Sequence, residues 1–325
     1  MPANLTPQYF DAEEAFKKAV TVEEKITALE EMLAVIPKHK GTEKMQADLK
    51  KRLSKLREEG QRKSKTARVD PFFVEKQGAG QVALVGFPNT GKSALVGAVT
   101  RAKPKVADYP FATTVPLAGM MPYEDIFIQL VDTPPITQEL VPPGLAGALR
   151  NADALLVLVD AGSDECLEQL EFCLKYLNDK KIVLDAVASN KQGVPPDRCL
   201  VLAARADLPN SPENIEILRE LGPAGLELYP ISAVAGIGLE ALKSKVFSML
   251  GVIRIYTKAP GKEPDLKTPF ILQKGSTIQE LAASIHRDLP RLMKNARIWG
   301  SARFEGQSVM RDHVLQDRDI VEITQ

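Results

Sequence analysis

The sequence has no excess of charge of either sign, few aromatic residues and few cysteines. Its 42 Lys and Arg balance 42 Asp and Glu, so the formal net charge is 0, and attraction to nucleic acid or membrane must come from local clusters. Aromatic residues make up 6%, which disfavours a sugar-binding site or an aromatic cage. The three cysteines, Cys166, Cys173 and Cys199, form no C-x-x-C pair, which is typical of ordinary thiols in a reducing compartment.

Long apolar runs and a targeting segment are also missing. The strongest apolar run, 154–159, is far shorter than the roughly 20 residues that cross a bilayer. The first residues lack the basic and apolar stretches of a secretory signal. The histidines, His39, His286 and His313, are scattered and lack metal-site spacing. We therefore expect a cytoplasmic protein with no membrane partner and no role as a reader of DNA sequence.

The first seventy residues predict a helical hairpin. Apolar residues recur at helical spacing over 22–33 and again over 45–56, and Pro37 and Gly41 interrupt the pattern between them. Residues 38–68 hold twelve Lys or Arg against four Asp or Glu. This basic arm is either a solvated surface or a surface that binds an anionic polymer such as RNA.

Three domains are predicted: 1–70, 71–251 and 252–325. In the second, short apolar runs alternate with helical stretches, which predicts an α/β domain with a mostly parallel sheet. Residues 252–257 and the Pro- and Lys-rich stretch 259–269 form its expected boundary. Beyond them, a strand, a capped helix, a hairpin and a last strand predict a small α+β domain. The apolar runs of the second domain are 82–86, 126–132, 152–161, 198–207 and 226–233.

The strongest motif is GFPNTGKS, residues 86–93, which fits G-x-x-x-x-G-K-[ST]. It follows an apolar run and opens a helical stretch, which is the context that a phosphate-binding loop requires. Its glycines let the chain curl so that backbone N–H groups and the helix N-terminus cradle phosphates. Lys92 is expected to neutralise the β- and γ-phosphates, and Ser93 to supply an oxygen to Mg²⁺. The candidate phosphate-binding residues are Gly86, Asn89, Thr90, Gly91, Lys92, Ser93 and Ala94.

A carboxylate further along completes this pattern. Asp132 ends an apolar run, where the tip of a strand would present it to the metal. With GFPNTGKS, the motifs ADYPFATTVP, VDTP, RAD and ISA resemble those of the Obg/DRG branch of small GTPases. The resemblance implies a P-loop GTPase fold that binds GTP and GDP with Mg²⁺. It also implies that Thr114 adds a second hydroxyl to Mg²⁺ as the switch threonine, with Thr113 as the alternative.

The resemblance covers almost the whole chain. Residues 37–59 are similar to the N-terminal helical segment of DRG proteins, and the tail, with KGSTIQELAASIH, ARIWG and DRDIVEI, is similar to a TGS domain, a ubiquitin-like β-grasp module. About forty residues separate Asp160 from Leu200, which leaves no room for the small domain inserted in DRG proteins. The chain thus resembles a compact, DRG-like prokaryotic GTP-binding protein. Trp299 is expected in the β-grasp core rather than as a base-stacking platform.

One signature departs from the GTPase pattern at switch II. Pro135 stands where D-x-x-G has its glycine, and proline has no N–H for the γ-phosphate. Ile136 follows, where Ras-like enzymes place the glutamine that orients water. The resemblance implies another aid, in which Asn89 holds K⁺ near the phosphates; otherwise Asn89 only caps the loop. The candidate catalytic residues are Lys92, Thr114 and Asn89.

The base-recognition signature N-K-x-D reads A-R-A-D here. Asp207 can accept from guanine N1–H and N2–H₂, which adenine lacks, and Arg205 can cover the face of the base. Ala204 has no amide to bind the base or to tie this loop to the P-loop, and losing such a contact typically costs about 1–3 kcal/mol. Ser232 and Ala233 match the signature whose N–H groups face guanine O6. Guanine is therefore expected over adenine, at reduced affinity.

Two functions follow from these motifs. The first is a slow, Mg²⁺-dependent GTPase switch that acts on the ribosome or another RNA assembly through the basic arm 38–68 and the TGS domain. The second is a nucleotide-binding sensor or scaffold with little hydrolysis, which Pro135 and Ala204 favour. Proline also stiffens the start of switch II, so we expect switch I alone to respond to GTP.

Overall fold

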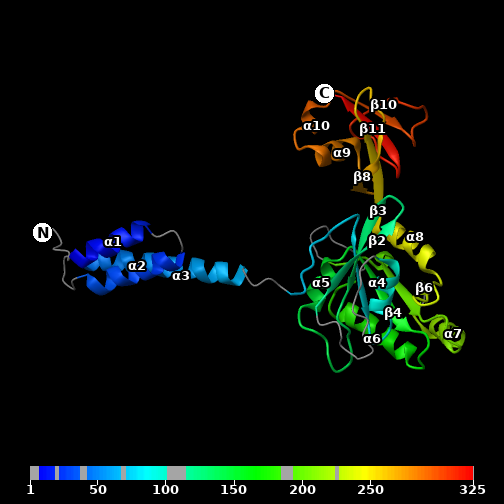
Figure 1. Cartoon of the computed structure of the whole chain (residues 1–325), viewed down its shortest axis with the longest axis horizontal. Coiled ribbons are helices and arrows are strands. Elements are labelled where there is room, and N and C mark those ends of the chain that lie inside the picture. Colours follow the sequence, from blue (N-terminus) through cyan, green and yellow to red (C-terminus); the bar gives the residue numbers. More distant parts are fainter. Residues whose placement is uncertain are drawn as a thin grey trace. The chain divides into compact units, whose positions relative to one another are not determined.

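The computed structural model describes residues 7–18, 22–36, 42–66, 71–100, 115–183, 193–223 and 227–324 (Figure 1). The chain divides into two compact units, Met1–Asp70 and Pro71–Gln325. Each unit has hydrophobic core residues of its own. Among the described residues, no helix is long and apolar enough to cross a membrane.

The first unit is helical, as expected. Its helices are α1 (Pro7–Lys18), α2 (Val22–Val35) and α3 (Glu43–Thr66). Helices α2 and α3 are the expected hairpin, whereas α1 is a further helix that the apolar spacing of 22–56 does not reveal. The three helices share one core, and the basic side chains of α3 at positions 50, 51, 52 and 55 are exposed. The core residues are Tyr9, Ala12, Leu29, Met32, Ile36, Leu49 and Leu53.

The second unit begins with a six-stranded sheet of order β2-β3-β1-β4-β5-β6. All neighbours in it are parallel except β2, which pairs antiparallel with β3. The sheet is therefore mostly parallel, as the alternation of apolar runs and helices predicts. Strand β2 is an addition, because no apolar run marks it. The strands are β1 (Gln81–Gly86), β2 (Leu117–Tyr123), β3 (Ile126–Asp132), β4 (Ala154–Asp160), β5 (Cys199–Ala204) and β6 (Leu228–Pro230).

Helices cover both faces of this sheet (Figure 1). Val82 and Leu84 share a core with α4 and α8, whereas Ala83 and Val85 share one with α5, α6 and α7. Because successive side chains of a strand point to opposite faces, a strand buried on both sides is apolar throughout. The helices are α4 (Lys92–Val99), α5 (Leu145–Asn151), α6 (Cys166–Asp179), α7 (Ser211–Leu221) and α8 (Leu239–Leu250), with a short 3₁₀ helix at Pro196–Arg198.

A separate five-stranded sheet of order β10-β9-β11-β7-β8 follows. Helix α9 packs on its core, and Thr277 and Glu280 form the capping box at its start. The hairpin and the last strand are confirmed as β9–β10 and β11. Its elements are β7 (Val252–Lys258), β8 (Asp265–Gln273), α9 (Ile278–Ile285), α10 (Leu289–Leu292), β9 (Asn295–Trp299), β10 (Gln307–Val309) and β11 (Asp319–Thr324).

One expectation about this sheet is wrong. Residues 252–257, where the third predicted domain begins, form strand β7, which pairs with β8 and β11 inside the sheet, whereas Trp299 does not lie in the core. Trp299 alternates along β9 with the core residues Ala296 and Ile298, so it lies on the opposite face. There the Lys258 ammonium is 4.6 Å from the centre of its ring.

Candidate functional site

The loop 86–93 connects β1 to α4, as its motif predicts. Two of its glycines are required by geometry. A Cβ on Gly86 would lie 2.5 Å from the Leu158 carbonyl oxygen, and Gly91 has a φ of +93°, which is costly for other residues. Asn89 also has a positive φ, 62°, which asparagine tolerates better than most side chains. The chain thus curls tightly between strand and helix.

Lys92 lies inside this curl and is only 6% exposed. Its Nζ donates to the carbonyl oxygens of Gly86 at 3.0 Å and Phe87 at 2.7 Å. The Thr90 hydroxyl also donates to Phe87, at 3.0 Å. Burial lowers the pKa of Lys92 to about 8, although the charge of Asp132 opposes the change. An ammonium has three N–H donors, so beyond these two bonds Lys92 retains a donor for an anion bound in the loop 86–93.

Ser93 and Asp132 lie next to each other. The Ser93 hydroxyl donates to Asp132 Oδ2 at 2.5 Å, because the register of β1 and β3 pairs Leu84 with Asp132 at the strand ends. A hydroxyl and a carboxylate are the oxygen ligands that Mg²⁺ takes when phosphates complete its shell. One hydroxyl and one carboxylate leave the other positions of such a shell for phosphate oxygens and water, so these two residues fit a phosphate-bound Mg²⁺.

The segment after Asp132 is attached to the P-loop. The Thr133 hydroxyl donates to the Leu84 carbonyl at 2.5 Å, and the Ile136 N–H donates to the Gly86 carbonyl at 3.2 Å. Ile136 is fully buried in the core on the α5 and α6 side, and Pro135 is buried beside it. The Ile136 side chain is therefore part of the core, and it does not project towards the loop as a water-orienting residue would.

Arg205 joins the base-recognition loop to the P-loop. Its Nη1 donates to Asp160 Oδ2 at 2.8 Å and its Nη2 to the Asn89 carbonyl at 2.7 Å. Its own carbonyl accepts from the Ser211 hydroxyl at 2.6 Å, and its φ is 60°. The buried Ala204 has no side-chain group for this tie, and the arginine beside it provides one.

Asp160 is a site residue that sequence reasoning missed. It ends the fully apolar strand β4, as Asp132 ends β3, and this shared pattern is the signal that could have found it. Its Oδ1 also accepts from the Gly162 N–H at 3.0 Å, and its backbone N–H donates to Gln169 at 3.0 Å. These two bonds hold Asp160 in the position where its carboxylate accepts from Arg205.

The other base-site candidates lie on two adjacent loops. The Ala206 N–H donates to the Ile231 carbonyl at 2.9 Å, which joins the loop of Asp207 to the start of the 232–237 turn. Asp207 is exposed. Ser232 is 1% exposed, and its N–H donates to Ile237 within its own loop. The Ser232 amide is therefore engaged, and Ala233 is the better candidate for guanine O6. The switch candidates Thr113 and Thr114 lie outside the described residues.

Comparison with known families finds one match in each sheet of the second unit. A family described as 50S ribosome-binding GTPase matches residues 81–189. The TGS domain family matches residues 253–325. The first match contains the loop 86–93 and Asp132, and the second contains the five-stranded sheet from β7 to β11.

Several relatives align with almost the whole chain. The uncharacterized GTP-binding protein MJ1326 of Methanocaldococcus jannaschii is 30% identical over 364 aligned positions, covering 93% of this chain and 92% of the relative. GTP-binding protein 1 of Schizosaccharomyces pombe is 29% identical, covering 92% and 98%. Developmentally-regulated GTP-binding protein 2 of Homo sapiens is 26% identical, covering 92% and 98%. The alignment with MJ1326 is longer than the 325 residues here, so the relative has residues that this chain lacks.

The lowered pKa of Lys92 predicts that nucleotide binding takes up a proton. Bound phosphate favours the ammonium, so it raises this pKa from about 8. Affinity is then full below about pH 8 and falls as the pH rises above it. At pH 8.5 the phosphates are already ionised, and calorimetry of GDP binding in buffers of different ionisation enthalpy should show proton uptake. Equal apparent enthalpies in all buffers would contradict this.

The tether of Arg205 predicts a loss of affinity when it is removed. Arg205→Met deletes the bonds to Asp160 and Asn89 and should weaken GDP binding about tenfold, the ordinary value of one or two such bonds. Arg219→Met is the matched control, because the exposed Arg219 guanidinium pairs with Glu216 on its own helix. Equal GDP affinity of the two variants in calorimetry would show that the tether does not position the nucleotide.

Proposed function

Because the chain belongs to the DRG-type family of GTP-binding proteins with a TGS domain, we propose that it binds GTP or GDP with Mg²⁺ at 86–93 and works as a slow GTPase switch. The observation that carries this proposal is the grouping of Lys92, Ser93 and Asp132 at the end of β1 and β3. The Lys92 ammonium for the phosphates and the two oxygens for Mg²⁺ lie beside a loop in which a side chain at Gly86 would clash with the Leu158 carbonyl.

Each candidate residue has a role in this proposal. Lys92 leaves the carbonyls of its own loop and binds the β- and γ-phosphates. Ser93, Asp132 and Thr114 supply oxygens to Mg²⁺, which in turn neutralises phosphate charge. Asn89 is exposed at the rim of the loop, where its side chain can hold K⁺ while its carbonyl accepts from Arg205.

The base site favours guanine in this proposal. Asp207 accepts from guanine N1–H and N2–H₂, and Ala233 donates to O6. Arg205 has a second role besides the expected one, since its guanidinium binds Asp160 and the Asn89 carbonyl. It holds the loop for the base, and its stem covers the face of the ring.

Hydrolysis by the chain alone is slow in this proposal. Pro135 has no N–H to offer the γ-phosphate, and the Ile136 N–H is already given to Gly86. The groups that remain for acceleration are Lys92, Thr114 and K⁺ at Asn89. The first two stabilise charge on the phosphates, which is the main catalytic work in phosphoryl transfer.

We assign the three parts 1–70, 71–251 and 252–325 to different tasks. The middle part binds nucleotide. The basic arm, whose described cations on α3 are exposed, and the TGS domain contact RNA, for which the ribosome is the candidate suggested by the matching family's description. The three cysteines are free thiols, which fits the reducing cytoplasm expected from the sequence.

The direct test is calorimetry of GDP, GTP and ATP binding. Lys92→Ala should abolish GDP binding, whereas Lys175→Ala, on the exposed side of α6, should leave it unchanged. Asp207→Asn should reduce the preference for GTP over ATP by tenfold or more, because the carboxylate accepts from two guanine donors that adenine lacks and the amide has only one acceptor oxygen. If Lys92→Ala retains GDP affinity, the phosphate-binding site is wrong. If Asp207→Asn leaves the ratio of GTP to ATP affinity unchanged, the assignment of Asp207 to the base is wrong.

The attachment of the 133–136 segment predicts that switch II changes little between nucleotide states. Hydrogen exchange with GDP and with a GTP analogue should differ across 101–114 and hardly across 132–142. Pro135→Gly returns an N–H and should raise the preference for GTP over GDP. Large exchange changes across 132–142, or rapid turnover of GTP without potassium, would contradict this and favour an ordinary two-switch enzyme. No turnover under any condition would favour the nucleotide-binding sensor.

A further inference from the structure

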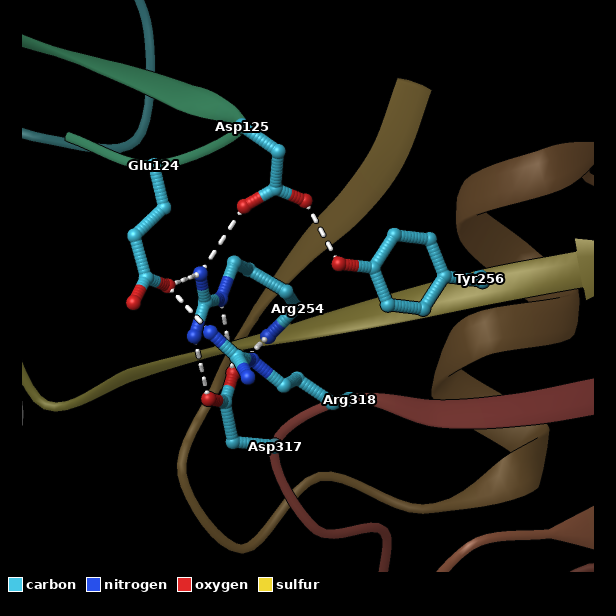
Figure 2. Close-up of polar contacts among 6 residues, drawn as sticks. All are labelled: Glu124, Asp125, Arg254, Tyr256, Asp317 and Arg318. Atoms are coloured by element: carbon cyan, nitrogen blue, oxygen red, sulfur yellow. Dashed lines mark hydrogen bonds and ion pairs between the residues drawn. The ribbon is translucent and has the colours of Figure 1, made fainter. Parts of the chain in front are cut away.

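Arg254 is buried to an unusual degree for an arginine, with 3% of its side chain exposed. It lies on β7, the first strand of the TGS sheet, and faces the two-residue turn of the β2–β3 hairpin (Figure 2). A buried guanidinium needs acceptors for its donors. Here the acceptors come from two different domains, so this side chain joins the nucleotide-binding domain, residues 71–251, to the TGS domain.

Asp317, in the loop before β11, supplies the acceptors on the TGS side. Its carboxylate accepts from Arg254 Nε at 3.1 Å and Nη2 at 2.7 Å, and from the Arg254 backbone N–H at 2.8 Å. The Arg318 N–H donates to the Arg254 carbonyl at 2.7 Å. Two parallel bonds to one carboxylate fix the plane of the guanidinium, so the TGS domain presents it in a set direction.

The hairpin turn, Glu124 and Asp125, supplies the remaining acceptors. Arg254 Nη1 donates to both carboxylates, the Tyr256 hydroxyl donates to Asp125 at 2.6 Å, and Arg318 donates to Glu124 at 2.5 Å. Bonds from Arg254 and then Arg318 lower the pKa of Glu124. Burial raises the pKa of Asp125, but the bonds from Tyr256 and Arg254 outweigh it and lower the pKa overall. Both carboxylates therefore stay ionised at neutral pH.

The two sides of this cluster have opposite net charge. Arg254 and Arg318 against Asp317 give the TGS side +1, and the turn carries −2, so the two sides attract. If the hairpin moves away, Asp317 stays bonded to Arg254. The guanidinium then keeps a charged partner, which avoids the large penalty of a buried and unpaired charge. The contact can therefore open on the hairpin side without unfolding the TGS domain.

The hairpin connects this cluster to the nucleotide site. Its strands pair without a break from Tyr123 opposite Ile126 to Leu117 opposite Asp132. Seven residues of strand span about 23 Å. At the far end, Asp132 accepts from Ser93, and β2 starts three residues after the predicted switch threonine Thr114. Strand β3 is also held by β1 from Gln129 to Asp132, whereas β2 is the edge strand of the sheet. A displacement at the start of β2 therefore reaches the turn along this edge strand.

We propose that the β2–β3 hairpin couples the nucleotide site to the TGS domain: the turn bound to Arg254 favours GDP, and GTP with Mg²⁺ weakens that contact. This inference rests on the proposed nucleotide binding. Ser93 and Asp132 would hold Mg²⁺ with either nucleotide, so the difference between the two states lies in the γ-phosphate, which draws in Thr114 and pulls on the start of β2. This pull acts on the base of the hairpin. By linkage, release of the turn favours GTP in return.

The test neutralises the turn in the full chain. Glu124→Gln with Asp125→Asn removes both charges and keeps the side-chain shapes. With Mg²⁺ present, calorimetry should show the Kd for GDP divided by the Kd for a non-hydrolysable GTP analogue rising about fivefold or more, the lower end of ordinary allosteric coupling. Glu168→Gln with Glu171→Gln, two exposed acids of α6, is the charge-matched control and should leave the ratio unchanged.

Hydrogen exchange of 117–126 gives a second measurement. This segment should exchange faster with the GTP analogue than with GDP in the natural chain, and equally in the turn variant. An unchanged or lower ratio in a variant that binds nucleotide refutes the coupling alone, whereas absence of nucleotide binding in the natural chain refutes the proposed function. If the double variant does not fold, Tyr256→Phe removes only one bond to Asp125. It must raise the ratio by a smaller factor, and no rise refutes the coupling.

Discussion

The buried ammonium of Lys92 is the interaction on which the nucleotide site depends. It donates to the Gly86 and Phe87 carbonyls, so it holds the loop curled in the conformation that only glycine allows at 86 and 91. Burial keeps its pKa near 8, which means that the charge is costly to hold and is stabilised when phosphate arrives. The loop is thus built before the ligand binds, and an anion completes it.

Three attachments radiate from this loop. Asp132 is joined to it by Ser93, the 133–136 segment by the Ile136 N–H, and the base-recognition loop by Arg205. The 133–136 segment is attached where GTPases usually have the mobile switch II, and Pro135 has no N–H that could bind a γ-phosphate. Nucleotide state must then be transmitted elsewhere. The β2–β3 hairpin is the continuous route from Asp132 to the TGS domain, because Arg254 binds the turn at its other end.

Local pattern explains what could be predicted from sequence. The P-loop, Asp132 and the capped helix α9 are each determined within a few residues, so motif and periodicity find them. Strand β2 was missed because its sequence, LAGMMPY, contains glycine and proline and owes its structure to pairing with β3. The Arg205–Asp160 pair joins residues 45 apart and Arg254–Glu124 residues 130 apart. Contacts at such separations depend on topology, which no local pattern contains.

A crystal structure of the full chain with GDP and Mg²⁺ tests the central claim most directly, because it locates the nucleotide without relying on a variant. The account predicts the β-phosphate within the curl of 86–93, Lys92 Nζ bonded to phosphate oxygen in place of the Gly86 and Phe87 carbonyls, and the guanine edge on Asp207 with Arg205 still bonded to Asp160. A nucleotide bound elsewhere on the chain, or a Lys92 still bonded to both carbonyls beneath the phosphates, would contradict it.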